Sequence, residues 1–528
     1  MAELAQLLDL PTELLLLILS HPDLPSDDLL NLSVLCRRLH HLALPIYFQT
    51  HGIEDPTQRA DFNILDSGRD PLAALQMALF IPVITELSCS FPHYETSIHP
   101  LFPHIHRLRT LIARLVFVRK VTLVLDTPDS FCGATGDGVD TWALEFGELL
   151  NTILKRGCTS LTLRYGMFFS QAYKLRPPRL VTRPVHAFRN VVRHMKPENE
   201  LAIPEGWEAL QLDIADTDVV SMEVDPEGCS SSTLTHFKIE SSMLLLPPCF
   251  SWSLSALRHS PLTCLELYGI TLPTKIWSAV LPPVAALVPA LADLNLSNLY
   301  GISGIDILLF LVKLPWLKRL TIGYTEYSRH IQSACPDSGP IPKLHELTHL
   351  HAPSTFISHF LQKKSLPKLE SLCITPRKPI LGFRGMRHIG RSVSDIVRRL
   401  EKHKLTPTLA LEIYRARDSD SEMAADLAVA PGEELMRSLR AITRLIVYSD
   451  AELTGPELGT LARWIARFPA LLHVSLRVRG DGCASLDTAR TIAERNPNVE
   501  SLELNGKLFD AGSSLKRISR ENPPFIGR

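Results

Sequence analysis

The sequence predicts an α/β chain in which a small N-terminal module of three helices precedes an irregular strand–helix solenoid with a parallel sheet. Three observations predict it: a dense apolar run near the start, a strand pattern that returns at intervals of 26 to 30 residues, and helical periods between its copies. At 528 residues the chain exceeds the size of a single hydrophobic core, which favours a repetitive architecture. The expected segments are the helical module (5–50), a connection (51–70), the solenoid (71–510) with insertions near 164–205 and 375–405, and a polar tail (511–528).

The helical module opens with the apolar run "LPTELLLLIL" at residues 10–19. A further helix is expected from Ser26, an N-cap residue followed by two acids in the first turn, where the helix dipole favours negative charge. Its apolar stripe is formed by Leu29, Leu32, Cys36 and Leu39. Pro45 is expected to end the helix. About 40 residues are too few to bury this apolar surface alone, so the module packs either on the rest of the chain or on a partner protein.

The segment "LPTELLLLILSHPDLPSDDLLNLSVLCRRLHHLA" resembles an F-box. The residues that match this family's pattern in order are Leu10, Pro11, Glu13, Leu14, Ile18, Leu19, Asp28, Leu29, Leu30, Leu32, Cys36, Arg37 and Arg38. Leu35 stands where the family usually has valine, and the first loop is irregular, but neither departure removes an apolar contact. The chain as a whole resembles a fungal-type F-box protein.

This resemblance implies a partner. An F-box binds the Skp adaptor of a cullin–RING ubiquitin ligase, so part of the apolar run would be core and part would be covered by the adaptor. The residues that we expect to contact the adaptor are Leu10, Pro11, Leu14, Ile18, Leu19, Leu29, Leu32, Cys36 and Leu39.

A proline-marked strand pattern returns behind the module. Its copies are "PVITELSC" (82–89), "PALADLNL" (289–296), "PWLKRLTI" (315–322), "PKLESLCI" (367–374), "PALLHVSL" (469–476) and "PNVESLEL" (497–504), with looser copies from Cys158, Thr233, Pro261 and Ala441. Proline ends a helix and releases an extended strand. Helical periods fill many gaps, as at 304–314, 393–404, 455–468 and 485–495. The pattern resembles leucine-rich repeats, but their ladder asparagine is mostly missing, so an irregular repeat is expected.

The two insertions are rich in charge. Residues 164–196 hold eight Lys and Arg without an acid, and residues 198–227 hold ten acids without a base. These blocks are either solvated and mutually neutralising, or part of a target-binding face. On the second interpretation, Arg384, Arg387 and Arg391 would contact an acidic or phosphorylated target.

No pattern in the sequence assembles a catalytic site, and we expect neither an enzyme nor a cofactor. The glycine-rich "GATGDG" (133–138) lacks the Lys-Ser/Thr of a phosphate-binding loop and is expected to be a loop. Possible metal ligands are Cys89, His93, His99, His104 and His106, but their spacing fits no zinc-finger pattern. His349, His351 and His359 are expected at strand and helix surface positions of one repeat. No metal site is therefore expected.

The sequence thus predicts a substrate receptor of an SCF (Skp–cullin–F-box) ubiquitin ligase, which binds the adaptor through the F-box and an unknown target protein through the repeats. The alternatives are an interaction scaffold that acts without a cullin and, less in keeping with the missing motifs, an enzyme. With 55 basic against 56 acidic residues and no apolar run long enough to span a bilayer, neither nucleic acid nor a membrane is expected as a partner. Scattered cysteines without paired spacing favour the cytoplasm or nucleus.

Overall fold

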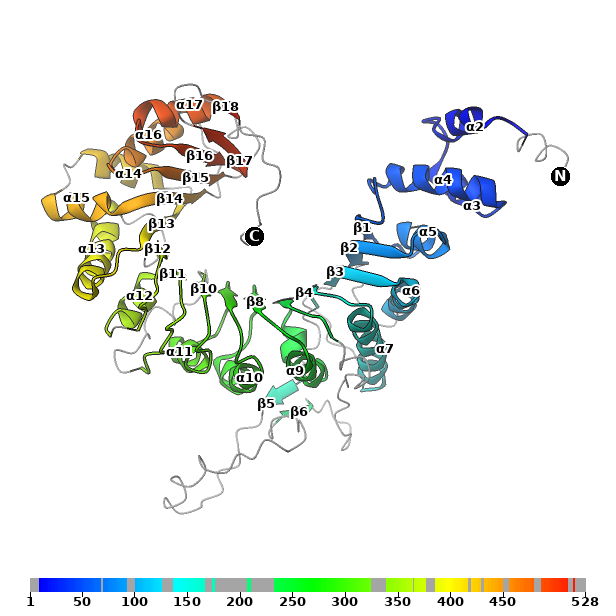
Figure 1. Ribbon diagram of the computed structural model, residues 1–528, viewed down its shortest axis with the longest axis horizontal. Helices are drawn as coiled ribbons and strands as arrows, with labels where there is room; N and C mark the ends of the chain where they lie inside the picture. Colours follow the sequence, from blue (N-terminus) through cyan, green and yellow to red (C-terminus); the bar gives the residue numbers. More distant parts are fainter. Residues whose placement is uncertain are drawn as a thin grey trace, which may run out of the picture. The chain divides into compact units, whose positions relative to one another are not determined.

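The computed structural model divides the chain into two compact units, residues 1–288 and 289–528, and each is described by itself (Figure 1). The residues that it describes are 9–67, 70–92, 100–125, 136–166, 173–175, 207–209, 232–323, 339–363, 365–376, 385–415, 419–428, 432–449, 455–478, 486–510 and 516–517. Among them, no helix combines the length and apolar content that crossing a membrane requires.

The first unit begins with the three-helix module that the sequence predicts. Its helices are α2 (Thr12–Leu19), α3 (Ser26–Ser33) and α4 (Arg37–Thr50). The prediction that Pro45 ends a helix is wrong, because Pro45 lies inside α4. The buried residues Leu44, Tyr47 and Phe48 flank it, and their packing outweighs the hydrogen bond that proline cannot donate. Ser26 is likewise not the N-cap, a position that Pro25 takes without a side-chain hydrogen bond.

Tyr47 makes the stability of this module sensitive to alkaline pH. Its side chain is fully buried, and its hydroxyl has no hydrogen-bond partner among the described residues. Burial, followed by the charges of Asp70 and Asp27, raises the pKa of Tyr47 to about 12. The unfolded chain releases this proton near pH 10, whereas the folded chain retains it, so stability is kept below pH 10 and lost as pH rises from about 10 to 12.

We therefore expect Tyr47→Phe to flatten this alkaline loss by up to about 2 kcal/mol while leaving stability near pH 7 within about 1 kcal/mol of the wild type. Urea unfolding at a series of pH values measures the difference. Tyr165→Phe is the control, because Tyr165 is exposed. An equal flattening in both variants would contradict the assignment to the buried hydroxyl.

The rest of the first unit alternates strands with helices. Its strands are β1 (Arg59–Asn63), β2 (Val83–Phe91), β3 (Phe117–Leu125), β4 (Ser160–Tyr165), β7 (His236–Glu240) and β8 (Cys264–Tyr268), which lie side by side in this order and pair in parallel. The helical elements are α5 (Pro71–Met77), α6 (Leu101–Arg114), α7 (Gly136–Lys155), η4 (Ser242–Leu245), α9 (Cys249–His259) and α10 (Thr274–Leu287). A separate antiparallel pair is formed by β5 (Tyr173–Leu175) and β6 (Trp207–Ala209).

The second unit repeats the same alternation. Its parallel strands are β9 (Asp293–Ser297), β10 (Arg319–Ile322), β11 (His349–Pro353), β12 (Ser371–Thr375), β13 (Thr408–Arg415), β14 (Ile442–Ser449), β15 (His473–Val478) and β16 (Ser501–Leu504). The antiparallel strands β17 (Lys507–Asp510) and β18 (Lys516–Arg517) follow. The helices are α11 (Gly304–Val312), α12 (Ser354–Phe360), α13 (Gly385–His403), α14 (Ser419–Ala428), α15 (Glu433–Arg440), α16 (Gly455–Ile465) and α17 (Leu486–Arg495).

Within each unit the helices line one face of the strands (Figure 1). Strand residues alternate between buried positions against the helices and less buried positions on the opposite face, which we call the open face. Equivalent residues of successive repeats lie opposite one another in neighbouring strands: Phe237 pairs with Leu265, and Leu294 pairs with Leu320. The α/β class with a long parallel sheet is thus confirmed, and every copy of the strand pattern forms a strand.

Some elements differ from the sequence prediction. β1 lies within residues 51–70, the stretch expected to connect the module and the solenoid. β3, β11 and β13 lack a proline at the position that it occupies in the strand pattern. The expected loop at "GATGDG" is wrong from Gly136 on, where α7 begins. The insertion near 164–205 lies largely outside the described residues, while the one near 375–405 contains α13.

Candidate functional site

The inward side chains of the front module hold it together. Leu15 and Leu19 of α2, Leu29 of α3 and Leu39 of α4 are each at most 3% exposed. Leu19, Leu29 and Leu39 are among the residues expected to contact the adaptor; their side chains are buried within the module, and their contact with an adaptor stays a prediction. They form the core because they occupy the inward positions of three short helices that pack on one another.

The outward side of α2 exposes large apolar side chains. Leu14, Leu17 and Ile18 recur at helical spacings of three and four residues, so they share one side of the helix. Leu17 is 70% exposed, and Leu14 and Ile18 are about half exposed. We call these three residues the α2 apolar surface. Exposed apolar groups that gather on one side of a helix are typical of a protein-binding surface.

The other expected contacts divide between the edge of the module and its interior. Pro11 is exposed, whereas Leu10, Leu32 and Cys36 are half-buried. Leu17 is not among the expected contacts, and neither is Val34 at the end of α3, which is 61% exposed. Leu17 follows Leu14 by three residues in the unbroken apolar run, so the helical period alone could have identified it.

Arg38 holds the start of α2 against α4. Its Nη2 donates to the carbonyl oxygen of Leu10 at 2.8 Å and to Oγ1 of Thr12 at 3.1 Å. These bonds connect positions 26 and 28 residues apart in the chain and fix where the Leu10–Pro11 turn enters the helix. Arg38 of α4 therefore positions the helix that carries the α2 apolar surface.

We expect Arg38→Ala to weaken adaptor binding by about tenfold, because hydrogen bonds from a charged donor contribute about 1.5–3 kcal/mol. Binding of the purified adaptor, measured by calorimetry, tests this. Arg37→Ala is the matched control, since Arg37 is an exposed arginine one residue away on α4. If the two variants bind equally weakly, loss of positive charge explains the effect and the positioning role is wrong.

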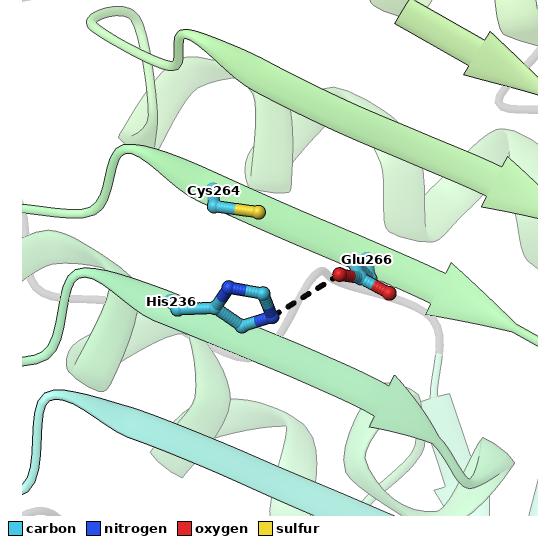
Figure 2. A group of neighbouring side chains, drawn as sticks. All are labelled: His236, Cys264 and Glu266. Atoms are coloured by element: carbon cyan, nitrogen blue, oxygen red, sulfur yellow. Dashed lines mark ion pairs between the residues drawn. The ribbon is translucent and has the colours of Figure 1, made fainter. Parts of the chain in front are cut away.

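A second feature lies on the open face of the first unit. Figure 2 shows His236 of β7 beside Cys264 and Glu266 of β8. His236 and Cys264 are register partners, and His236 Nε2 lies 3.2 Å from Glu266 Oε1. The ammonium of Lys238 lies 3.7 Å from Glu266 Oε2 and 2.8 Å from Glu240, so a cation already adjoins this cluster.

The second unit carries a cluster of the same three residue types. His351 of β11 and Cys373 of β12 are register partners, and Glu412 comes from β13. His351 Nε2 lies 2.6 Å from Glu412 Oε2 and 3.2 Å from Thr375 Oγ1. Burial lowers the pKa of His351, but Cys373 and Glu412 outweigh it by charge and hydrogen bonding and hold this pKa well above its usual value of 6.5.

The remaining sequence candidates do not come together among the described residues. Arg384 lies outside them, Arg387 is on α13, and Arg391 of α13 is exposed, so the proposed arginine cluster stays a prediction.

The other candidate metal ligands are placed separately. His93 and His99 lie outside the described residues, Cys89 is buried, and His106 is exposed. His104 is buried and lies 3.1 Å from Asp66. His359 was expected on a helix surface, which is wrong: it is 3% exposed because α12 turns it toward the carbonyl of Pro340.

Comparison with known families gives a match on the front module. The F-box-like family matches residues 7–48, the segment that contains α2, α3 and most of α4. Comparison with curated proteins gives no match for this chain. The chain therefore carries an F-box-like domain at residues 7–48, followed by a long parallel strand–helix sheet.

Proposed function

We propose that this chain is the substrate-recognition subunit of an SCF ubiquitin ligase. In this role the F-box-like domain docks on a Skp adaptor, and the strand–helix repeats bind the target protein. The observation that carries the proposal is the F-box-like match at residues 7–48 on a module that exposes the α2 apolar surface.

The repeats support the second half of the proposal. In each unit the open face presents mixed polar side chains on successive strands: Lys238 and Glu266 in the first unit, and Asn295 and Thr321 in the second. Repeated surfaces of this kind bind proteins. We regard the repeats as leucine-rich-repeat-like. A receptor of this kind needs no catalytic residues of its own, because holding the target near a conjugating enzyme raises the effective concentration of its lysines.

Co-purification tests the proposal. The full-length chain is mixed with a purified Skp adaptor and then with adaptor-bound cullin, and each mixture is resolved by gel filtration. A receptor forms both the binary complex and the complex with cullin. Binding of the adaptor without entry into the cullin complex would establish the interaction scaffold instead, and failure to bind the adaptor would overturn the proposal entirely.

A further inference from the structure

Three donor side chains meet on three consecutive strands of the second unit. His351, Cys373 and Glu412 project from β11, β12 and β13, and their ligand atoms all lie within 4.8 Å of one another. His351 and Cys373 occupy the less buried strand positions that face away from the helices. Because parallel strands hold their register along the whole sheet, this grouping is fixed by the backbone and does not depend on a flexible loop.

The donor set suits one class of ion. An imidazole nitrogen, a thiolate sulfur and a carboxylate oxygen are the three kinds of ligand that zinc binds in proteins, whereas magnesium and calcium prefer oxygen alone. In a tetrahedral site these ligands stand about 2.0–2.3 Å from the ion, so the donor atoms need only a small inward movement to share one ion.

The carboxylate of Glu412 faces the other two donors from a buried position. Its side chain is only 5% exposed, and burying a carboxylate is costly unless its charge is compensated. Among the described ion pairs its one partner is His351, whose Nε2 lies 2.6 Å from Oε2. A divalent cation in place of the imidazole proton would compensate the same carboxylate and would bind the neighbouring thiolate as well.

The cluster of the first unit is the weaker candidate although its residue types are the same. There, Lys238 lies 3.7 Å from Glu266, and this positive charge opposes a second cation at the same carboxylate. In the second unit, by contrast, the described ion-pair partner of Glu412 is His351, which is itself one of the proposed ligands. A metal bound at Nε2 of His351 replaces the proton on that nitrogen and keeps a positive charge beside Glu412.

We propose that His351, Cys373 and Glu412 bind a zinc ion. Three protein ligands leave the fourth tetrahedral position to a water molecule or to a donor side chain of a bound protein. The site would then add a metal-dependent contact to the open face. The inference does not depend on the ubiquitin-ligase role, because metal binding is measured on the chain alone.

Cobalt is the probe for this site. The full-length chain, stripped with a chelator and kept reduced, is titrated with Co²⁺, and thiolate ligation is detected as a sulfur-to-cobalt charge-transfer band. The band should appear in the wild type, vanish on addition of Zn²⁺, and be absent in Cys373→Ser. Glu412→Gln should raise the Kd for Zn²⁺ by more than the 10- to 100-fold that loss of an outer-shell partner typically costs.

Cys264→Ser is the matched control, because it removes the equivalent thiol from the first cluster, and it should leave the band unchanged. A band that survives Cys373→Ser, a band lost in Cys264→Ser instead, or no band in the wild type would overturn the proposal. A further measurement needs no variant: Zn²⁺ should protect Cys373, but not Cys264, from alkylation in the wild-type chain. Equal alkylation of Cys373 with and without Zn²⁺ would also refute the site.

Discussion

Leu17→Asp is expected to lower the affinity of the chain for a Skp adaptor by at least about 100-fold. Leu17 is the most exposed residue of the α2 apolar surface, so an adaptor that covers this surface buries the side chain almost completely. Losing a buried apolar anchor costs about 2–4 kcal/mol, and a carboxylate left without a partner in the interface adds to this cost. About 2.8 kcal/mol already corresponds to 100-fold.

Because Leu17 points away from the module, the substitution should leave the fold intact. Leu309→Asp is the matched control: Leu309 is also an exposed leucine on a helix, but it lies on α11 of the second unit. Calorimetry with the purified adaptor measures both variants, and circular dichroism checks their folding. If Leu17→Asp binds as tightly as Leu309→Asp, the α2 apolar surface is not the docking surface.

Much of the fold can be predicted because local and global signals agree along the repeats. Proline both ends the preceding helix and precedes an alternating strand, so "PKLESLCI" predicts β12. β3 and β11 carry no such proline, and they form strands because the flanking strands leave paired positions for them. Pairing with the neighbouring strands, and not the local proline pattern, therefore accounts for these two strands.

The helical module shows the opposite case, in which a strong local signal was overridden. Pro45 ordinarily ends a helix, yet α4 continues for five more residues to Thr50. Leu44, Tyr47 and Phe48 are almost fully buried beside it, and the energy of burying three large side chains exceeds the cost of an interior proline. Which side chains become buried depends on the neighbouring helices α2, α3 and α5 that pack on α4, and a local pattern does not contain that information.

The zinc-binding candidate could not be predicted from spacing for a similar reason. His351 and Cys373 are 22 residues apart, and Glu412 lies 39 residues further on, unlike the short spacings of known zinc motifs. Yet "Leu350-His351-Ala352" and "Leu372-Cys373-Ile374" place histidine and cysteine at the same position of the strand pattern. Aligning the repeats would have brought this pair together, whereas Glu412 needed the longer strand β13.

A buried ion pair anchors the first repeat where the front module ends. The carboxylate of Asp70 is fully buried and receives two bonds from Arg107 of α6, at 2.6 and 3.2 Å. It also accepts from the backbone nitrogens of Leu65, at 2.9 Å, and Ala73, at 3.1 Å, and so caps α5. The same charge reaches Tyr47 of α4, where it contributes to the raised pKa. One side chain thus connects α5, α6 and the segment that follows β1.

Asp70→Ala is expected to lower the free energy of unfolding by about 3–5 kcal/mol, because removal of one partner leaves the Arg107 guanidinium largely buried and uncompensated. The cap of α5 is lost as well. Asp61→Ala is the control: Asp61 pairs with Arg59 at the surface, where an ion pair contributes about 1 kcal/mol or less. Urea unfolding of the wild type and both variants measures the difference.

A third variant, Asp70→Asn, keeps the shape and one acceptor oxygen but not the charge. Its loss of unfolding free energy should therefore fall between the losses of Asp70→Ala and Asp61→Ala. Equal losses for Asp70→Ala and Asp61→Ala would mean that the front of the sheet is held by apolar packing alone.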